Sequence, residues 1–392
     1  MSDQLAYALI TPYSLLKSRT GGIIGRLLAH ARLELVATRM YVFSDKFVDA
    51  YKKVLYPPQT DPVFQGAWDK YVDEWLRPGS AWGFLPRCML MLLKGPNAVQ
   101  HLKDEVIGQF TEEPVGDTIR GTYGDFIRGE DGEIHYFEPA VMTAPNEELN
   151  DVHLKLLSDY AISDGGVLTG RIAYEHPDTE VSLVMLKPDN FERRSRLPGN
   201  IIDTFSLTGL RIVAAKLFNM TVAQGEKFYG PLKGIFVDKL KGNISKAIHD
   251  RLSDAFMFPF TMKDADAFAD RLAKRNATTE FNKIVEYMTG VDPAEITDPA
   301  EKATASKAKC LALLYEGPGA IEKIRKVLGS TDPARAEPGT VRSDFGRDLM
   351  RNGAHASDSP ENALRERRIV GLAKTDKDTC DLCQLISQYL RR

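Results

Sequence analysis

The chain has 392 residues, more than a typical single domain, so we expect two domains. Hydrophobic residues make up 43% of the chain and charged residues 27%, a composition typical of a soluble globular protein. The formal net charge of -3 excludes a strongly basic protein, and we therefore expect no nucleic-acid partner.

The N-terminal residues 1–7 contain no basic segment leading into an apolar run, and no stretch reaches membrane-spanning length. We therefore expect a cytoplasmic protein with no membrane partner. Its four cysteines, Cys88, Cys310, Cys380 and Cys383, are too few for a disulfide scaffold in a chain of this length. Cys380 and Cys383 form a single C-x-x-C, for which we favour a reduced pair over a zinc or redox site.

Short stretches of the first half return in the second half in the same order, which indicates a duplicated domain. The matching pairs are 7–12 with 183–188, 33–40 with 210–217, 90–96 with 311–318, and 116–120 with 338–342. Turn residues gather between the two copies. We therefore expect a first domain at 1–165, a linker at 166–179 and a second domain at 180–392.

The periodicity of the second copy predicts alternating strands and helices. The expected elements are strands at 183–188, 210–217, 310–314 and 343–349, and helices at 198–207, from about Thr221, and at 320–328. Gly329 ends the last of these helices. The order is β-α-β-β-α-β, the ferredoxin-like arrangement of an α+β protein, with helices on one face of an antiparallel sheet. We expect both copies to have this fold.

The second copy carries additional residues at about 238–308, between its second and third strands. Helical patterns at 244–256, 264–274 and 279–287 precede a loop rich in proline and alanine at 291–307. Alternating charges in this helical insertion indicate a solvated helical face, and a lid or an assembly contact is the alternative.

A single histidine, His355, lies among small residues directly before a strong helix start near the C-terminus. Asp358 or Ser359 can cap that helix, and Pro360 fits its first turn. A helix N-terminus offers backbone N–H groups and a positive dipole, which favour a phosphate group. The local pattern alone leaves two interpretations open, a nucleophile that handles phosphate and a structural histidine.

The chain contains no P-loop motif, so the positive charge around a phosphate must come from separate side chains. Candidates in the second copy are Lys187 at the end of the first strand, Arg325 on the helix at 320–328, and Arg342. Each alone is more often a surface charge, but their joint placement at the ends of elements favours a phosphate site.

The run Asn-Gly-Ala-His-Ala-Ser-Asp-Ser-Pro, from Asn352 to Pro360, resembles the active-site signature of nucleoside diphosphate kinases. Further residues fall in the family's order and near its spacing, namely Lys187, Tyr229, Arg325, Thr331, Arg342 and Glu366. The resemblance covers most of residues 181–372, apart from the helical insertion.

This resemblance implies a catalytic cycle and a role for each matching residue. His355 would take the γ-phosphate of a nucleoside triphosphate and pass it to a nucleoside diphosphate in a ping-pong cycle, since a neutral imidazole is available near pH 7. Glu366 would accept the second ring N–H of His355 and fix its tautomer. Ser357 would support Glu366 and the transferring phosphate.

The same resemblance implies the nucleotide contacts. Phosphate oxygens would contact Lys187, Arg325, Thr331 and Arg342, with Tyr229 near the transferred group, Asn352 and Lys187 at the ribose, and Phe236 and Leu349 flanking the base. Stacking between apolar side chains predicts weak base selectivity. Mg²⁺ would come bound to the nucleotide phosphates, with no metal site made by protein ligands.

The first copy departs from this pattern at several positions. Thr11 stands in place of Lys187, Lys103 in place of Arg325 and Met142 in place of His355, whereas Arg120 corresponds to Arg342. A thioether cannot form a phosphoramidate, so we expect this copy to be catalytically silent. We expect it to pair with the active copy, in a homo-oligomer built from intrachain domain pairs.

Two alternatives to a kinase remain. One is a nucleotide-sensing or regulatory protein with little turnover, in which the helical insertion blocks the cycle. The other is a protein that passes phosphate to a histidine of another protein.

Overall fold

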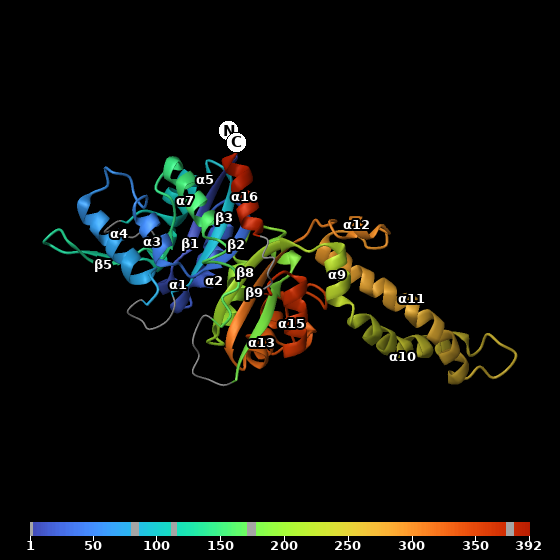
Figure 1. The fold of residues 1–392 in the computed structure, drawn as a ribbon. Coiled ribbons are helices and arrows are strands. Elements are labelled where there is room, and N and C mark those ends of the chain that lie inside the picture. Colours follow the sequence, from blue (N-terminus) through green and yellow to red (C-terminus); the bar gives the residue numbers. More distant parts are fainter. Residues whose placement is uncertain (1–2, 80–85, 111–115, 171–177, 374–379) are drawn as a thin grey trace. The chain divides into compact units, whose positions relative to one another are not determined.

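The computed structural model describes residues 3–79, 86–110, 116–170, 178–373 and 380–392 (Figure 1). The chain forms two compact units, one made of Met1–Phe218 with Leu311–Arg392 and one of Asn219–Cys310. We call the second the helical unit. The first unit holds two antiparallel four-stranded sheets and is therefore α+β, as predicted. Residues 171–177 of the predicted linker lie outside the described residues, and the predicted domain limits stay a prediction.

The first sheet has the strand order β2-β3-β1-β6, in which β1 pairs with β3 and β6. Residues 5–10 of β1 are all at most 1% exposed, so both faces of this strand are covered. In chain order the elements of this half are β1 (Asp3–Ile10), α1 (Pro12–Leu16), α2 (Thr20–His30), β2 (Glu34–Tyr41), α3 (Asp45–Lys52), α4 (Pro62–Trp75), β3 (Cys88–Pro96), α5 (Ala98–His101), the π-helix η1 (Leu102–Ile107), α6 (Ile119–Tyr123), β4 (Asp125–Arg128), β5 (Ile134–Glu138), β6 (Val141–Met142) and α7 (Glu147–Asp159).

The second sheet has the order β10-β7-β9-β8, which repeats the arrangement of the first. Its strands and intervening helices follow the predicted β-α-β-β-α-β order, as β7, α8, β8, β9, α13 and β10. The elements are β7 (Thr179–Leu186), η2 (Pro188–Phe191), α8 (Leu197–Ser206), β8 (Arg211–Asn219), β9 (Lys309–Pro318), α13 (Ala320–Leu328), η3 (Pro333–Arg335), α14 (Val341–Phe345), β10 (Ala354–Ala356), α15 (Pro360–Ile369) and α16 (Asp381–Leu390).

The prediction of a final strand near 343–349 is wrong. A short helix, α14, occupies this region because the Thr340 side chain caps it by accepting a hydrogen bond from the backbone N–H of Ser343. The final strand is instead β10, which carries His355 and pairs with β7. β10 has only three residues, none of them β-branched, and it lies between a glycine and a serine. The sequence pattern therefore does not indicate this strand.

The two halves contact each other through α2 and α8. A side chain at Gly21 would collide with the backbone of Gly199 and Asp203, and one at Gly199 with the backbone of Gly21 and Gly25. Glycine therefore permits the close approach of these helices. The start of the predicted linker also joins the halves, because Gly166 N–H donates to Met40 O and Leu168 N–H donates to Val213 O.

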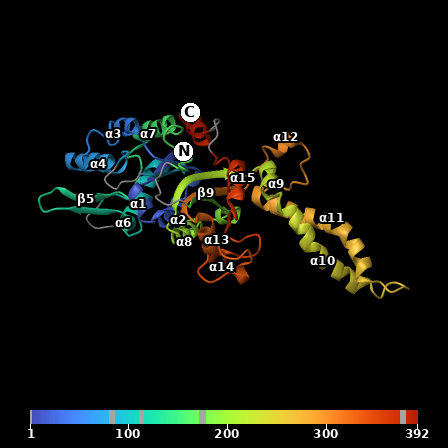
Figure 2. The same cartoon turned by 60° about the horizontal axis from the view of Figure 1, so that its bottom comes forward.

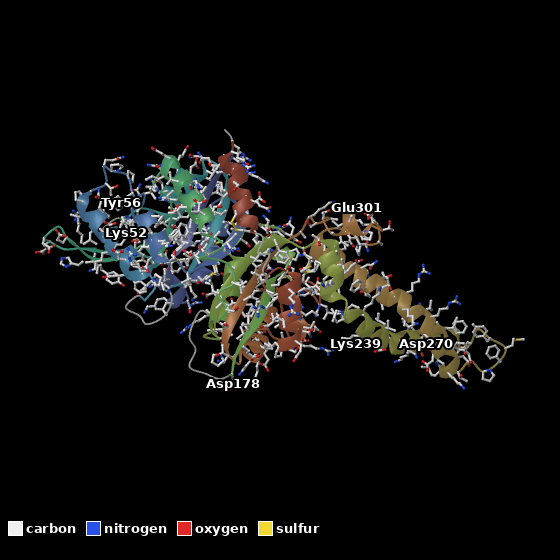
Figure 3. The ribbon with its side chains drawn as sticks, in the orientation of Figure 1. Lys52, Tyr56, Asp178, Lys239, Asp270 and Glu301 are labelled. Carbon is white, nitrogen blue, oxygen red and sulfur yellow. A yellow bond between two sulfur atoms is a disulfide. The ribbon has the colours of Figure 1, made fainter. Side chains whose placement is uncertain are left out.

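The helical unit contains α9 (Val222–Tyr229), α10 (Leu232–Leu252), α11 (Met262–Thr289) and α12 (Pro299–Lys302). α10 and α11 run side by side as a hairpin in Figures 1 and 2. Lys241 Nζ on α10 lies 2.6 Å from the carboxylate of Asp270 on α11, and Asp270 is labelled in Figure 3. The prediction of separate helices at 264–274 and 279–287 is wrong, because neither proline nor glycine interrupts α11 and a buried alanine stripe runs along it. α10 also begins before the predicted 244–256 segment, and α12 lies in the predicted loop.

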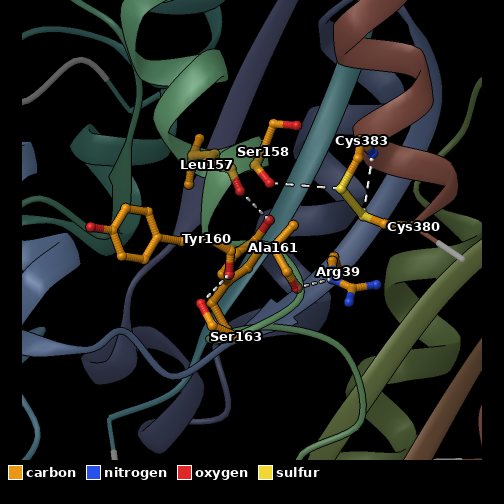
Figure 4. The surroundings of a disulfide bond; sticks show 9 residues. Arg39, Leu157, Ser158, Tyr160, Ala161, Ser163, Cys380 and Cys383 are labelled. Atoms are coloured by element: carbon orange, nitrogen blue, oxygen red, sulfur yellow. Dashed lines mark hydrogen bonds between the residues drawn. A yellow bond between two sulfur atoms is a disulfide. The ribbon is translucent and has the colours of Figure 1, made fainter. Parts of the chain in front are cut away.

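The cysteine pair differs from the expected reduced state. Cys380 and Cys383 form a disulfide at the start of α16 (Figure 4). Their Cα atoms are 5.1 Å apart, within the range that a disulfide spans, because residues three apart lie on one face of a helix start. α16 packs against α7, and the Cys383 sulfur lies 3.7 Å from the Ser158 carbonyl oxygen.

Among the described residues, no helix has the length and apolar character needed to cross a membrane.

Candidate active site

His355 lies on β10, an edge strand, opposite Met185 of β7. Its neighbours Ala354 and Ala356 are buried, whereas the imidazole keeps 22% of its side-chain surface exposed. Gly353 precedes the strand with φ of 81°, a conformation that favours glycine. The strand thus presents one polar ring at a position that solvent reaches.

The imidazole is held by a buried carboxylate. His355 Nε2 lies 2.9 Å from Glu366 Oε2, and Ser357 Oγ donates to the same oxygen at 2.7 Å. Glu366 is 4% exposed and Ser357 is fully buried. A carboxylate with two donors on one oxygen is held in one orientation, and it orients the ring in turn.

Helix α15 positions this carboxylate. Ser359 is the N-cap, with its side chain accepting from Asn362 N–H, and Pro360 is the first helical residue, as the sequence predicts. Glu366 follows about two turns later on the buried face of the helix. Its second oxygen, Oε1, pairs with Arg365 Nη2 at 3.2 Å.

A second polar group lies at the end of β7. Lys187 Nζ donates to Asn352 Oδ1 at 2.6 Å and to Met350 O at 2.9 Å, and Lys187 is only 9% exposed. Asn352 Nδ2 donates in turn to Thr331 O and Leu349 O at 2.9 and 3.1 Å. These bonds connect the lysine, the loop before β10 and the segment after α13.

Arg342 on α14 joins this group to the histidine strand. Its guanidinium donates to Gly329 O at 3.1 Å and to Ala354 O, next to His355, at 3.4 Å, and one of its nitrogens lies 3.5 Å from Thr331 Oγ1. Burial, with a smaller effect of the Arg325 charge, lowers the pKa of Arg342 to about 10. Arg342 thus remains cationic at neutral pH and sets positive charge beside the histidine strand.

Eight of the predicted site residues are joined by these interactions, namely Lys187, Arg325, Thr331, Arg342, Asn352, His355, Ser357 and Glu366. Leu349 contributes its carbonyl, while 64% of its surface is exposed. Tyr229 on α9 and Phe236 on α10 belong to the helical unit, and their place beside His355 stays a prediction.

Sequence reasoning missed two residues that support the site. Asn190 is 1% exposed, and its Nδ2 donates to Gly353 O at 2.7 Å and to Lys187 O at 2.9 Å. Arg365 pairs with the outer oxygen of Glu366. The run Lys187-Pro-Asp-Asn190 was a usable signal, because a short amide shortly after a strand end often bonds nearby backbone groups.

The first half has a different set of residues at the corresponding positions. Met142 on β6 lies opposite Leu9, and Leu9 matches Met185 in the repeat, so the register places methionine at the His355 position. His153 stands seven residues after the N-cap Asn146, as Glu366 stands after Ser359. Its ring contacts Tyr7 Oη and Val54 O, and burial lowers its pKa to about 4.

Arg120 keeps the contacts of Arg342, donating to Gly108 O at 2.7 Å and to Val141 O at 3.2 Å. Thr331, two residues after Gly329, corresponds to Phe110, two residues after Gly108. The Arg120 guanidinium lies 4.2 Å from the centre of the Phe110 ring. An aromatic face therefore replaces a hydroxyl at this position.

Comparisons with known proteins match the second half of the chain. The family model for nucleoside diphosphate kinase matches residues 180–248 and 299–371. A nucleoside diphosphate kinase of Symbiobacterium thermophilum is 32% identical over 190 residues, 48% of this chain and 85% of that protein. One of Methanobrevibacter smithii is 31% identical over 200 residues, 51% of this chain and 90% of that protein.

Among solved structures, the crystal structure of an NDP kinase from Pyrobaculum aerophilum is 28% identical and covers 49% of this chain and 94% of that chain, with a TM-score of 0.33. The family assignment rests on the sequence relatives, because the two named above are more than 30% identical to this chain and are matched over most of their length. The chain therefore belongs to the nucleoside diphosphate kinase family.

Proposed function

We propose that this chain transfers the γ-phosphate of a nucleoside triphosphate to a nucleoside diphosphate through a phosphohistidine at His355. The observation that carries the proposal is the 2.9 Å contact between His355 Nε2 and Glu366, in a chain of this family. A buried carboxylate supported by Ser357 holds one ring nitrogen, while the ring keeps some exposure for a substrate.

The contact with Glu366 selects the tautomer. Nε2–H donates to the carboxylate, so Nδ1 carries the lone pair of the neutral ring. Nδ1 attacks the γ-phosphorus, the bond from that phosphorus to the bridging oxygen breaks, and the nucleoside diphosphate leaves with the electron pair. A terminal oxygen of a second diphosphate then attacks the phosphohistidine, breaks the N–P bond and restores the ring. Glu366 stabilises the positive charge that the ring acquires during attack.

The cations near His355 would stabilise the charge on the phosphate oxygens. Arg342 is anchored beside the histidine strand by Ala354 O and Gly329 O, and Arg325 and Lys187 add further charge. Thr331 would also contact these oxygens, and Asn352 with Lys187 would meet the ribose hydroxyls.

The donor set does not resemble a magnesium cage. Among the described residues, no three of histidine, cysteine, aspartate or glutamate are grouped as a metal site, and Glu366 already bonds Ser357 and His355. The residues therefore fit Mg²⁺ held by the nucleotide phosphates, where it would neutralise charge on their oxygens.

Three residues complete the proposed nucleotide site. Tyr229 would lie near the transferred phosphate, and Phe236 and Leu349 would flank the base. Stacking between apolar side chains recognises a flat ring with little preference among bases. We therefore expect adenine, guanine and pyrimidine nucleotides to be accepted.

We also propose that the first half is a degenerate, ferredoxin-like copy of the kinase domain. The repeated strand order and the preserved contacts of Arg120 support this origin, and Met142 makes the copy silent. The packing of α2 on α8 supports an intrachain domain pair, from which we expect a homo-oligomer.

Steady-state turnover tests the function. With ATP and cytidine diphosphate, the chain should form cytidine triphosphate with the parallel double-reciprocal lines of a ping-pong cycle. A nucleotide sensor would give at most one labelled phosphate per chain and no continued production of cytidine triphosphate, which would overturn the proposal.

A further inference from the structure

The first half contains a cavity of about 360 Å³ at the place that corresponds to the active site of the second half. Met142 and Arg120, the counterparts of His355 and Arg342, both line it, and so do Trp68 and Phe110. Pockets for small molecules have volumes of about 300 to 1,000 Å³. The first half therefore has, at this place, a cavity large enough for a small ligand.

Two cations lie in the wall of this cavity. Arg120 donates to two backbone carbonyls through its terminal nitrogens, but its buried Nε has no hydrogen-bond partner among the described residues. Lys103 donates to Pro145 O at 3.3 Å and lies 3.4 Å from Asp104, with 26% of its side chain exposed. A buried N–H of an arginine without an acceptor favours an anionic ligand group.

Aromatic side chains form part of the remaining wall, beside polar and aliphatic residues such as Thr60, Gln109 and Leu55. The Arg120 guanidinium lies over Phe110, and the Trp68 and Phe110 rings have centroids 5.7 Å apart. Phe64 lines the cavity and stacks on Phe126 at 5.6 Å. Tyr56, labelled in Figure 3, lines it too and donates its hydroxyl to Asp69. Such faces pack against flat rings by stacking and edge contacts.

This cavity has fewer of the polar side chains that would bind a phosphate chain than the site of the second half has. Thr11 replaces Lys187 and is bound to Glu138 and to Ala140 O, and Phe110 replaces Thr331. Asp104 lies 3.4 Å from Lys103 and Asp69 accepts from Tyr56, so among the described residues Arg120 is the lining cation with no carboxylate paired to it. This charge matches a single carboxylate better than a di- or triphosphate.

We propose that this cavity binds a flat aromatic carboxylate. The carboxylate accepts from Arg120 Nε and from Lys103, and its ring packs among Trp68, Phe110 and Met142. The site is independent of the chemistry proposed for His355.

Calorimetric titration of the full chain with 2-naphthoate tests the proposal, with the uncharged 2-naphthamide as the matched probe. We expect one 2-naphthoate per chain and binding of the amide at least about tenfold weaker, because it lacks the charge-assisted hydrogen bonds. Lys103→Gln should weaken 2-naphthoate binding about tenfold. The control Lys155→Gln, on the exposed face of α7, should leave it unchanged.

Arg120→Lys keeps the positive charge but loses the planar array of N–H donors of the guanidinium. It should therefore also weaken 2-naphthoate binding about tenfold. Arg120 donates to two backbone carbonyls, so the fold of Arg120→Lys is first compared with that of the wild type by circular dichroism. If Arg120→Lys is unfolded, the result for Lys103→Gln alone tests the proposal. Equal affinity for the acid and the amide, an unchanged affinity in Lys103→Gln, or no binding at millimolar 2-naphthoate would each overturn the proposal.

Discussion

His355 on β10 and Met142 on β6 occupy the same position in their two sheets. His355 lies opposite Met185 of β7, and Met142 lies opposite the matching residue Leu9 of β1. The strand order is repeated around both. The chain thus holds an imidazole and a thioether in equivalent backbone settings, and the difference between the halves at this position lies in the side chain.

The first prediction concerns Glu366, the proposed orienting acid. Glu366→Gln keeps a group that Ser357 can bond but removes the charge that holds and stabilises the His355 ring. We expect kcat to fall by about 10²-fold with little change in KM for the diphosphate. The control Glu361→Gln, at an exposed site in the first turn of the same helix, should keep full activity. Equal loss in both variants would assign the effect to the helix and not to the carboxylate.

A second prediction concerns the hydrogen bonds of Asn352, which connect Lys187 to the segments around the site. Asn352 is 1% exposed and bonds Lys187, Thr331 O and Leu349 O. Asn352→Ala should lower the free energy of unfolding by about 2 to 3 kcal/mol, because buried partners lose their hydrogen bonds. Urea denaturation measures this change. Asn200→Ala, at an exposed position of α8, serves as the control and should change the free energy by less than about 0.5 kcal/mol.

A third prediction tests the silence of the first half within the full chain. Met142→His combined with His355→Ala should show no phosphoryl transfer, since His153 stands at the position of the orienting acid and Phe110 at that of Thr331. Incubation with γ-labelled ATP measures this. Label on the imidazole introduced at position 142 of the double variant would show that the single substitution disabled an otherwise complete site.

A fourth prediction follows from a buried acid of the first half. Glu138 is 2% exposed, and burial raises its pKa from 4.5 to about 7, although Ala140 N–H, Tyr71 and Thr11 donate to it. The folded state therefore holds the proton more tightly than the unfolded state. The contribution of Glu138 to the free energy of unfolding should therefore fall as pH rises from about 4.5 to about 7, and stay level above that.

Glu138→Gln removes this titration. The variant should gain stability relative to the wild type by about 2 to 3 kcal/mol more at pH 8 than at pH 5, measured by urea denaturation. The exposed Glu133→Gln is the control and should show no such pH dependence. A gain from Glu138→Gln that is larger at pH 5 would contradict the direction of the shift.

Much of this arrangement could be predicted from the sequence because the motif residues lie at the ends of regular elements. Lys187 follows a buried apolar run and Glu366 follows a well-capped helix start, but their neighbourhood with His355 was implied by the resemblance to the family's motif. The alignment of Met142 with His355 rested on the same repeat, and the strand register places it there.

Other features depend on contacts that a linear pattern does not encode. The β10 strand has three residues and is held by pairing with β7, and α14 depends on the Thr340 cap. The disulfide between Cys380 and Cys383 was not expected. The cavity at Arg120 depends on Trp68 of α4 and on Phe110, which come together in space although they are far apart in the sequence.

Mapping the phosphorylated residue tests the central claim most directly. The wild-type chain, mixed with γ-labelled ATP in the absence of a diphosphate, should take up close to one phosphate. The bond should be labile in acid and stable in base, should map to the peptide containing His355, and should be discharged by added diphosphate. His355→Ala should take up none. Label on another residue, or undiminished label in His355→Ala, would contradict the account.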